Sequence, residues 1–93
     1  MSNIEFMIPE SFAVTEADDL REECVKAMKQ GKKDFVFNFR NCKFIDSTGL
    51  GVLVSIYKKC KENGGHVELV SVNNSDVLRV FKLTRLDEVF NIK

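Results

Sequence analysis

The residues best suited to chemistry lie together in one short segment, Phe44-Ile45-Asp46-Ser47-Thr48-Gly49-Leu50-Gly51-Val52. Asp46 is a good N-cap for a helix, because its carboxylate can accept a hydrogen bond from one of the first free backbone N–H groups. Ser47 would then be the first helical residue, where the positive end of the helix dipole favours a phosphate on its hydroxyl. Local chemistry alone leaves a second interpretation open, in which Asp46, Ser47 and Thr48 only cap the helix.

Two glycines, Gly49 and Gly51, fall in the same helix opening, although each costs about 1 kcal/mol relative to alanine inside a helix. Their missing side chains permit either close packing on the protein's own sheet or close approach of a partner's backbone, and the sequence favours neither. Six of the eight residues over 50–57 are apolar, which is more than one buried stripe requires. We expect a neighbouring helix over residues 75–83 to cover most of this arc, and an uncovered part beside Ser47 would form a protein-binding patch.

Other chemistries fit the sequence poorly. The run Gly49-Leu50-Gly51-Val52-Leu53-Val54 supplies two of the three glycines of a dinucleotide fingerprint and has valine in the third place, so no cofactor is expected. Cys24, Cys42, Cys60 and the single histidine, His66, form no clustered ligand set, so we expect free thiols and no metal site. No serine or cysteine is paired with a histidine for nucleophilic catalysis, and the protein is not predicted to be an enzyme.

The composition is typical of one small globular domain. The 93 residues are 44% hydrophobic and 30% charged, with 14 basic and 14 acidic side chains. A chain of this length supports a single core, so we predict one domain over residues 1–93. The zero net charge argues against direct binding of nucleic acid, which usually meets a basic surface. No apolar run approaches the roughly 18 residues of a membrane span and no signal-peptide pattern opens the chain, so we expect a cytoplasmic monomer that does not bind membranes.

Hydrophobic periodicity predicts the elements that must position this segment. Residues 4–8 alternate as in a strand, and this first strand could run antiparallel to the others. Thr15 is the expected N-cap of a first helix, which Gly31 ends. Residues 35–39 are apolar on both sides, so we expect a central strand that is covered on both faces.

The chain after this strand continues the alternation of helices and strands. The predicted elements are a loop over residues 40–45, a helix over 47–63 stopped by Gly64-Gly65, a strand over 67–72, a short helix over 75–83 capped by Asn73-Asn74-Ser75, and a turn or helix with a last strand over 86–92. This order indicates an α/β fold, with a mixed, mainly parallel sheet of four or five strands and three or four helices.

The heptapeptide Asp46-Ser47-Thr48-Gly49-Leu50-Gly51-Val52 resembles the signature of STAS domains, in particular that of the bacterial anti-sigma-factor antagonists. The similarity covers roughly residues 17–92 and includes the strand over 35–38, the Gly64-Gly65 turn, and the run Leu78-Arg79-Val80-Phe81 with Leu83 and Leu86. The resemblance implies a single compact STAS-like domain.

The resemblance also implies a switch rather than an enzyme. In such antagonists the unmodified protein binds an anti-sigma factor that is also a serine kinase, and thereby releases the sigma factor to activate transcription. The kinase phosphorylates the serine that follows the aspartate, here Ser47, and a metal-dependent serine phosphatase reverses the reaction. The other matching positions are then expected to contact the partner: Asp46, Thr48, Gly49, Leu50 and Gly51.

The sequence departs from the family pattern before the first helix and at its end. The stretch Glu10-Ser11-Phe12-Ala13 lacks the glycine and the second acid of the Gly-Glu-x-Asp-like turn, which shortens the N-terminal sheet, and a C-terminal helix is missing because the chain ends at Lys93. Thr48 is a weaker phosphate acceptor than Ser47, because it lies one position deeper in the helix. An alternative hypothesis is an adaptor subunit of the same fold, for example in lipid transport, that docks a partner without phosphorylation.

Overall fold

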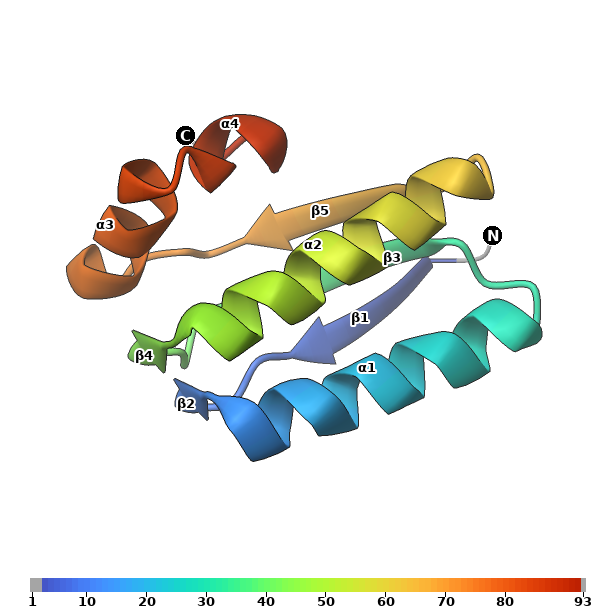
Figure 1. Ribbon diagram of the computed structural model, residues 1–93, viewed down its shortest axis with the longest axis horizontal. Helices are drawn as coiled ribbons and strands as arrows, with labels where there is room; N and C mark the ends of the chain where they lie inside the picture. The colour runs from blue at the N-terminus through green and yellow to red at the C-terminus, as the bar shows by residue number, and fades with distance from the viewer. Residues whose placement is uncertain (1–2, 93) are drawn as a thin grey trace.

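The computed structural model describes residues 3–92, in which helices and strands alternate (Figure 1). In chain order the described elements are β1 (Asn3–Met7), β2 (Ser11–Phe12), α1 (Val14–Lys29), β3 (Asp34–Asn38), β4 (Phe44–Ile45), α2 (Ser47–Glu62), β5 (His66–Val70), α3 (Ser75–Leu83) and α4 (Leu86–Val89). The predicted α/β class, the mainly parallel sheet and the approximate numbers of helices and strands are confirmed.

The strands form two separate parallel ladders. The larger sheet has the order β1-β3-β5, and the smaller one pairs β2 with β4 over two residues each. β1 runs parallel to β3, from Asn3 opposite Asp34 to Met7 opposite Asn38. The antiparallel direction considered for the first strand is therefore wrong, because α1 carries the chain back across the sheet, as crossover helices do between parallel strands.

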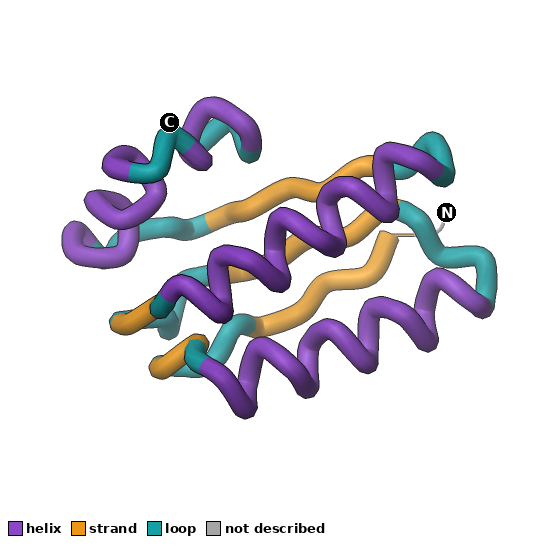
Figure 2. Tube along the Cα trace, viewed as in Figure 1, coloured by secondary structure: helices purple, strands orange, loops and turns teal. Residues whose placement is uncertain are grey.

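The core lies between one face of the larger sheet and the helices α1 and α2 (Figure 2). Phe35 and Phe37 project from β3 into this layer and are 1% and 0% exposed. The ring of Phe6 on β1 lies 6.0 Å from that of Phe35 and 5.8 Å from that of Phe37. Both helices contribute small and medium side chains to the same layer: Ala17, Leu20, Cys24, Ala27, Leu53, Ile56 and Cys60.

The opposite face of the larger sheet is open in the described part of the chain. Glu5 and Glu68 are exposed on it, and Val36 is only half-buried. The molecule measures 19 Å along its shortest axis, which suits one helix layer on one sheet, each about 10 Å thick. The prediction that β3 is covered on both faces is therefore wrong, because polar Asp34 and Asn38 flank Val36 on this side.

Two helix ends follow from local sequence. Gly31 adopts a φ of +89° after α1 and Gly64 a φ of +75° after α2, a left-handed conformation that glycine adopts readily. The start of α1 differs from the prediction, because the helix begins at Val14 and its N-cap is Ala13 rather than Thr15. The backbone N–H of Ala13 donates to Oε1 of Glu16 at 3.3 Å, and the Ala13 side chain itself caps no helix N–H group.

Three further expectations from the sequence need correction. The predicted loop over residues 40–45 contains the short strand β4. The turn or helix predicted at the start of 86–92 is present as α4, but no strand follows it in the described residues. The apolar arc of α2 lies against α1 and β5 rather than α3. Phe90 completes this cover, since its ring meets that of Tyr57 edge-on at 5.4 Å. No helix in the described range is long and apolar enough to cross a membrane.

Candidate functional site

The short ladder of β2 and β4 brings the starts of α1 and α2 together (Figure 1). Ser11 lies opposite Phe44, and Phe12 lies opposite Ile45. The ladder continues into the helix start, because the backbone N–H of Asp46 donates to the carbonyl of Phe12 at 3.4 Å. Each helix begins within two residues of its strand, so the ladder fixes both helix N-termini at one end of the molecule.

Asp46 is the N-cap of α2, as predicted. Its Oδ1 accepts a hydrogen bond from the backbone N–H of Gly49 at 2.9 Å, and its carbonyl accepts from the N–H of Leu50 at 3.1 Å. Ser47 is the first helical residue, and both Ser47 and Thr48 are exposed. Ser47 is therefore accessible to solvent at the helix end where the dipole favours an anion.

The two glycines of the helix start have different environments. A Cβ atom on Gly49 would lie 2.6 Å from the carbonyl oxygen of Phe12 and 2.8 Å from its ring, so packing on β2 requires glycine there. A Cβ on Gly51 would meet no atom within 4 Å, and Gly51 is exposed. Packing within the protein thus explains why residue 49 is glycine, but it does not explain why residue 51 is glycine.

A shallow hollow of about 260 Å³ lies between the starts of α1 and α2. Thr48 and Val52 line it from α2, and Val14, Asp18 and Asp19 are among the residues that line it from α1. Val14 is 61% exposed although it is apolar. This side of Ser47 therefore combines an exposed valine with the carboxylate of Asp19, while the Asp18 carboxylate is already paired with Arg21 at 2.6 Å.

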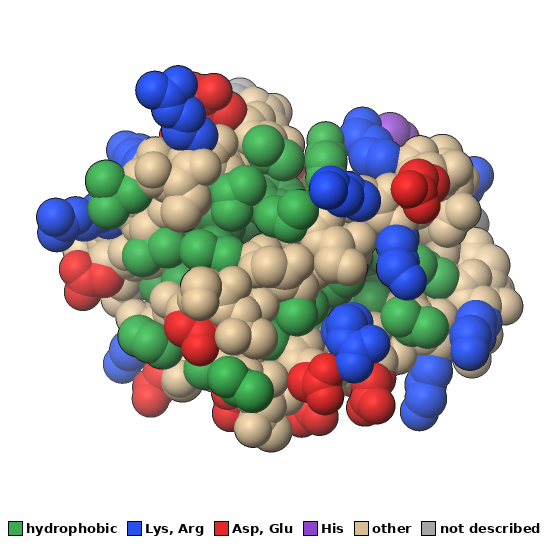
Figure 3. All heavy atoms as spheres, viewed as in Figure 1, with side chains coloured by type: hydrophobic (Ala, Val, Ile, Leu, Met, Phe, Trp, Pro, Cys, Tyr) green, Lys and Arg blue, Asp and Glu red, His purple; other side chains and the backbone are tan. Residues whose placement is uncertain are grey.

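A second hollow, of about 220 Å³, lies on the other side of the helix start, between β4 and α3. Its apolar walls come from Ile45, Val77 and Val80, with Phe44 at its edge. The Phe44 side chain is 53% exposed, which is unusual for a residue with so much apolar surface. Figure 3 shows hydrophobic side chains on the half of this face where α1 and α2 begin, and many basic side chains at the end where they stop.

The structure brings the predicted site residues together and adds others that the sequence did not single out. Asp46, Ser47 and Thr48 form one surface, but Gly49 is buried and Leu50 half-buried. Val14 and Phe44 were missed as site residues because neither is unusual in its local sequence. Only the pairing of β2 with β4 places them on either side of Ser47.

The cysteines are not exposed on this surface, although the Cys42 thiol donates to the carbonyl of Phe44 at 3.4 Å from below it. Cys24, Cys42 and Cys60 are free and buried. Burial raises the pKa of Cys24 to about 12 and that of Cys60 to about 11, which keeps both thiols protonated and unreactive. Within residues 3–92, no group of three or more His, Cys, Asp or Glu side chains is arranged to hold a metal ion.

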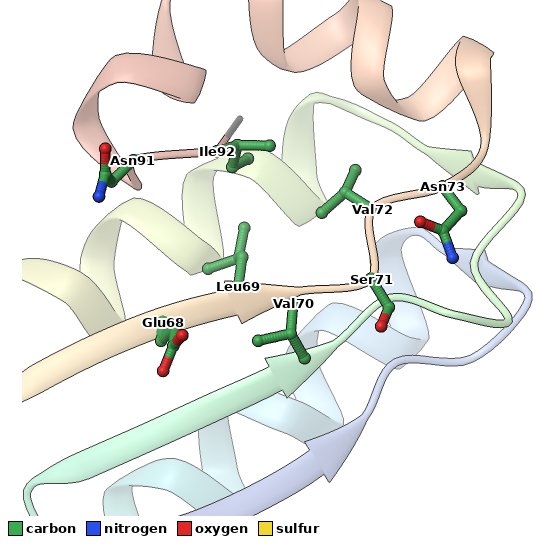
Figure 4. Close-up of a pocket in the computed structure, with 8 residues that line it drawn as sticks. All are labelled: Glu68, Leu69, Val70, Ser71, Val72, Asn73, Asn91 and Ile92. Carbon is green, nitrogen blue, oxygen red and sulfur yellow. The ribbon is translucent and has the colours of Figure 1, made fainter.

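A wider hollow of about 470 Å³ lies beside β5 and does not include the predicted site residues. Figure 4 shows its lining from two parts of the chain, the end of β5 with the following loop and the segment Asn91-Ile92. It opens broadly to solvent at the side of the sheet. The surface around Ser47 is exposed, and the hollows on either side of it are open to solvent.

The STAS domain family model matches residues 2–93 of the chain. The anti-sigma-B factor antagonist of Bacillus subtilis (strain 168) is 32% identical over 91 residues, which cover 98% of this chain and 82% of that protein. The anti-sigma-B factor antagonist of Staphylococcus aureus (strain NCTC 8325 / PS 47) is 31% identical over 72 residues, which cover 76% of this chain and 66% of that relative.

Solved structures agree with this fold. A Thermotoga maritima protein proposed to be an anti-sigma factor antagonist has a TM-score of 0.85 at 29% identity, over 95% of this chain and 75% of that one. The phosphorylated form of the Bacillus cell fate determinant SpoIIAA has a TM-score of 0.76 at 18% identity, over 94% of this chain and 78% of that one. The likeness to SpoIIAA, at this identity, is one of fold alone.

Proposed function

Because the chain belongs to the STAS domain family, we propose that it is an anti-sigma factor antagonist whose binding is controlled by phosphorylation of Ser47. Anti-sigma factor antagonists are regulatory proteins rather than enzymes. The unmodified protein binds an anti-sigma factor that is also a serine kinase, and so releases the sigma factor in the cytoplasm. The observation that carries this proposal is the exposed Ser47 at the start of α2, between an apolar hollow beside β4 and a hollow on the α1 side that has both apolar and acidic walls.

The two hollows and the helix start together form the proposed docking surface. Phe44 on one side and Val14 on the other offer apolar area that becomes buried on binding, which is the main source of affinity in protein complexes. Gly51 allows a partner's backbone to approach α2 closely, since no side chain of this protein fills the space next to it. Asp19 adds a charge that favours basic residues on the partner, whereas Asp18 is already paired with Arg21.

Phosphorylation would weaken this contact through local electrostatics. A phosphate on Ser47 adds about −1.5 to −2 charges beside the carboxylate of Asp46. The helix N-terminus tolerates this charge within the free protein, so the fold need not change. A partner surface that packs against a neutral serine would have to desolvate the phosphate. A loss of about 3 kcal/mol would reduce affinity more than a hundredfold.

The direct test compares binding of Ser47 variants to the anti-sigma factor kinase encoded in the same genome. Ser47→Ala should bind like the unmodified protein, because it keeps the surface neutral. Ser47→Asp should weaken binding about tenfold or more, because it places a full charge at the helix start.

Asn63→Asp is the matched control for this test, since it adds the same charge to the exposed far end of α2. It should bind within about twofold of the wild type. Equal affinities of Ser47→Asp and the wild type would refute the switch. A weakening by Asn63→Asp as large as that by Ser47→Asp would mean that net charge, rather than this site, controls binding.

A further inference from the structure

The face of the β1-β3-β5 sheet that points away from α1 and α2 has a regular pattern that the Ser47 site does not use. We call it the outer face. Strand register places Glu5 on β1 and Glu68 on β5 directly on either side of Val36 on β3. The next row toward the strand ends consists of Met7, Asn38 and Val70. Figure 4 shows Glu68 and Val70 on one side of β5 and Leu69 on the other.

On the outer face β3 presents one apolar side chain, Val36, between polar Asp34 and Asn38, while β1 and β5 each present a glutamate and an apolar residue. Val36 and Val70 are half-buried, and Met7 is 45% exposed. Glu5 and Glu68 are exposed, and the three strands contain no lysine or arginine. The amide of Asn38 donates to the Glu5 carboxylate at 3.0 Å, a contact that holds this side chain over the sheet without neutralising it.

An all-parallel sheet is normally covered on both faces by helices, because its connections run through helices and its strands present apolar side chains on each side. Here the described residues cover only one face. Neighbouring strands are about 4.8 Å apart, so Glu5 and Glu68 lie about 10 Å apart on either side of Val36. A helix is about 10 Å wide with its side chains, so one laid along β3 would fill this interval.

We propose that the outer face is a docking site for a cationic amphipathic helix of another protein. The apolar stripe of that helix packs on Val36 and, one row further along the strands, between Met7 and Val70. Lysine or arginine residues on its two flanks meet Glu5 and Glu68, which have no cationic partner within residues 3–92. Charge complementarity selects this occupant, since an acidic helix or the outer face of a second copy would bring like charges together.

The outer face lies on the opposite side of the sheet from α1 and α2 (Figure 1). A helix bound there leaves the start of α2 free, so the two surfaces can be occupied at the same time. The proposal does not depend on phosphorylation of Ser47. A negative test of the outer face would leave the Ser47 switch standing, and a negative test of the switch would leave the outer-face proposal standing.

The test is an NMR titration of the full chain at low ionic strength with a synthetic helix of about 18 residues, with leucine on one face and lysine on the other. The expected amide shifts fall on β1, β3 and β5, and binding weakens as salt is added. A peptide with glutamate in place of lysine should not bind. The variant Glu5→Gln/Glu68→Gln should weaken binding of the lysine peptide about tenfold, and glutamine at position 5 can still accept from Asn38.

The matched control is Glu22→Gln/Glu23→Gln, which removes the same charge from exposed positions of α1. It should change the affinity less than about twofold. Four results would overturn the proposal: no binding of the lysine peptide at millimolar concentration, shifts confined to α1 and α2, equal weakening by the two double variants, or outer-face shifts that grow with protein concentration alone. The last of these would identify a second copy of the chain as the occupant.

Discussion

Gly49 and Gly51 are two positions apart on α2, yet the structure gives them different reasons to be glycine. Gly49 is buried against Phe12, and any side chain there would collide with the backbone of β2. Gly51 faces open space. The sequence could not separate these cases, because the collision depends on a strand more than thirty residues earlier in the chain.

Replacing each glycine by alanine should therefore have opposite effects on stability. Gly49→Ala should lower the free energy of unfolding by about 1–3 kcal/mol, since the new methyl group must displace β2 or α2. Gly51→Ala should raise it by about 0.5–1 kcal/mol, because alanine is the better helix former and meets no atom. Urea denaturation measures both, and destabilisation by Gly51→Ala would show that its surroundings are not open.

Asp46 shows how much of the site is predictable at the scale of single residues. An aspartate before a helical pattern is a strong N-cap signal, and the structure confirms the cap through its hydrogen bond to Gly49. The same logic was wrong for Thr15, because the helix begins one residue earlier, at Val14, where Glu16 accepts from the N–H of the N-cap Ala13. A good capping residue type therefore does not by itself fix the residue at which a helix begins.

The elements that position Ser47 are the two short strands in front of the helices. Two-residue strands are too short to show a periodicity, so β4 was predicted as part of a loop. The exposure of Phe44, which lies on β4, could not be predicted for the same reason. Longer elements were predicted well, since α1, α2, β3 and β5 repeat their apolar residues over several turns or pleats. The sides that these elements present to solvent could not be predicted, because they depend on the order β1-β3-β5 and on the absence of a second helix layer within residues 3–92.

The docking surface predicts a difference between two exposed apolar residues. Phe44→Ser should weaken binding of the anti-sigma factor about tenfold or more, since a buried aromatic side chain often dominates an interface. Leu83→Ser is the matched control, because Leu83 is 73% exposed at the end of α3 and lies outside both hollows. Calorimetric titration measures both affinities. Equal effects of the two substitutions, or none from Phe44→Ser, would place the interface elsewhere.

The folded protein buries its cysteine thiols, and as a result its free energy of unfolding depends on pH in the alkaline range. The folded state raises the pKa of Cys24 from 9.0 to about 12 and that of Cys60 to about 11, chiefly through burial. The folded protein thus holds these protons more tightly than the unfolded chain. The contribution to stability is complete below pH 9 and is lost progressively as the pH rises toward about 11–12.

Urea denaturation between about pH 8 and pH 10.5 tests this link. The free energy of unfolding should fall with rising pH, and Cys24→Ala/Cys60→Ala should show a shallower fall than the wild type. The double variant will be less stable at every pH, so the slope rather than the absolute value is compared. Identical slopes would mean that other groups, such as the lysines, cause the alkaline loss.

At the scale of the whole protein, one side presents the start of α2 and the opposite side presents the open sheet. Only the first of these was predictable, because its signature is continuous in sequence. The outer face draws its residues from three separate strands, and its pattern becomes visible only through their register. The overall charge does not reveal the acidic residues of this face, because the net charge of the chain is zero.

The most direct test of the central claim is mass spectrometry of the protein purified from its own host, before and after phosphatase treatment. A switch at Ser47 predicts a fraction of molecules that carry one phosphate, mapped by fragmentation to Ser47 and removed by the phosphatase. Thr48, exposed at the next position, provides an internal comparison in the same peptide. A phosphate found only on Thr48, or none on Ser47 under several growth conditions, would contradict the switch and favour an adaptor that binds without modification.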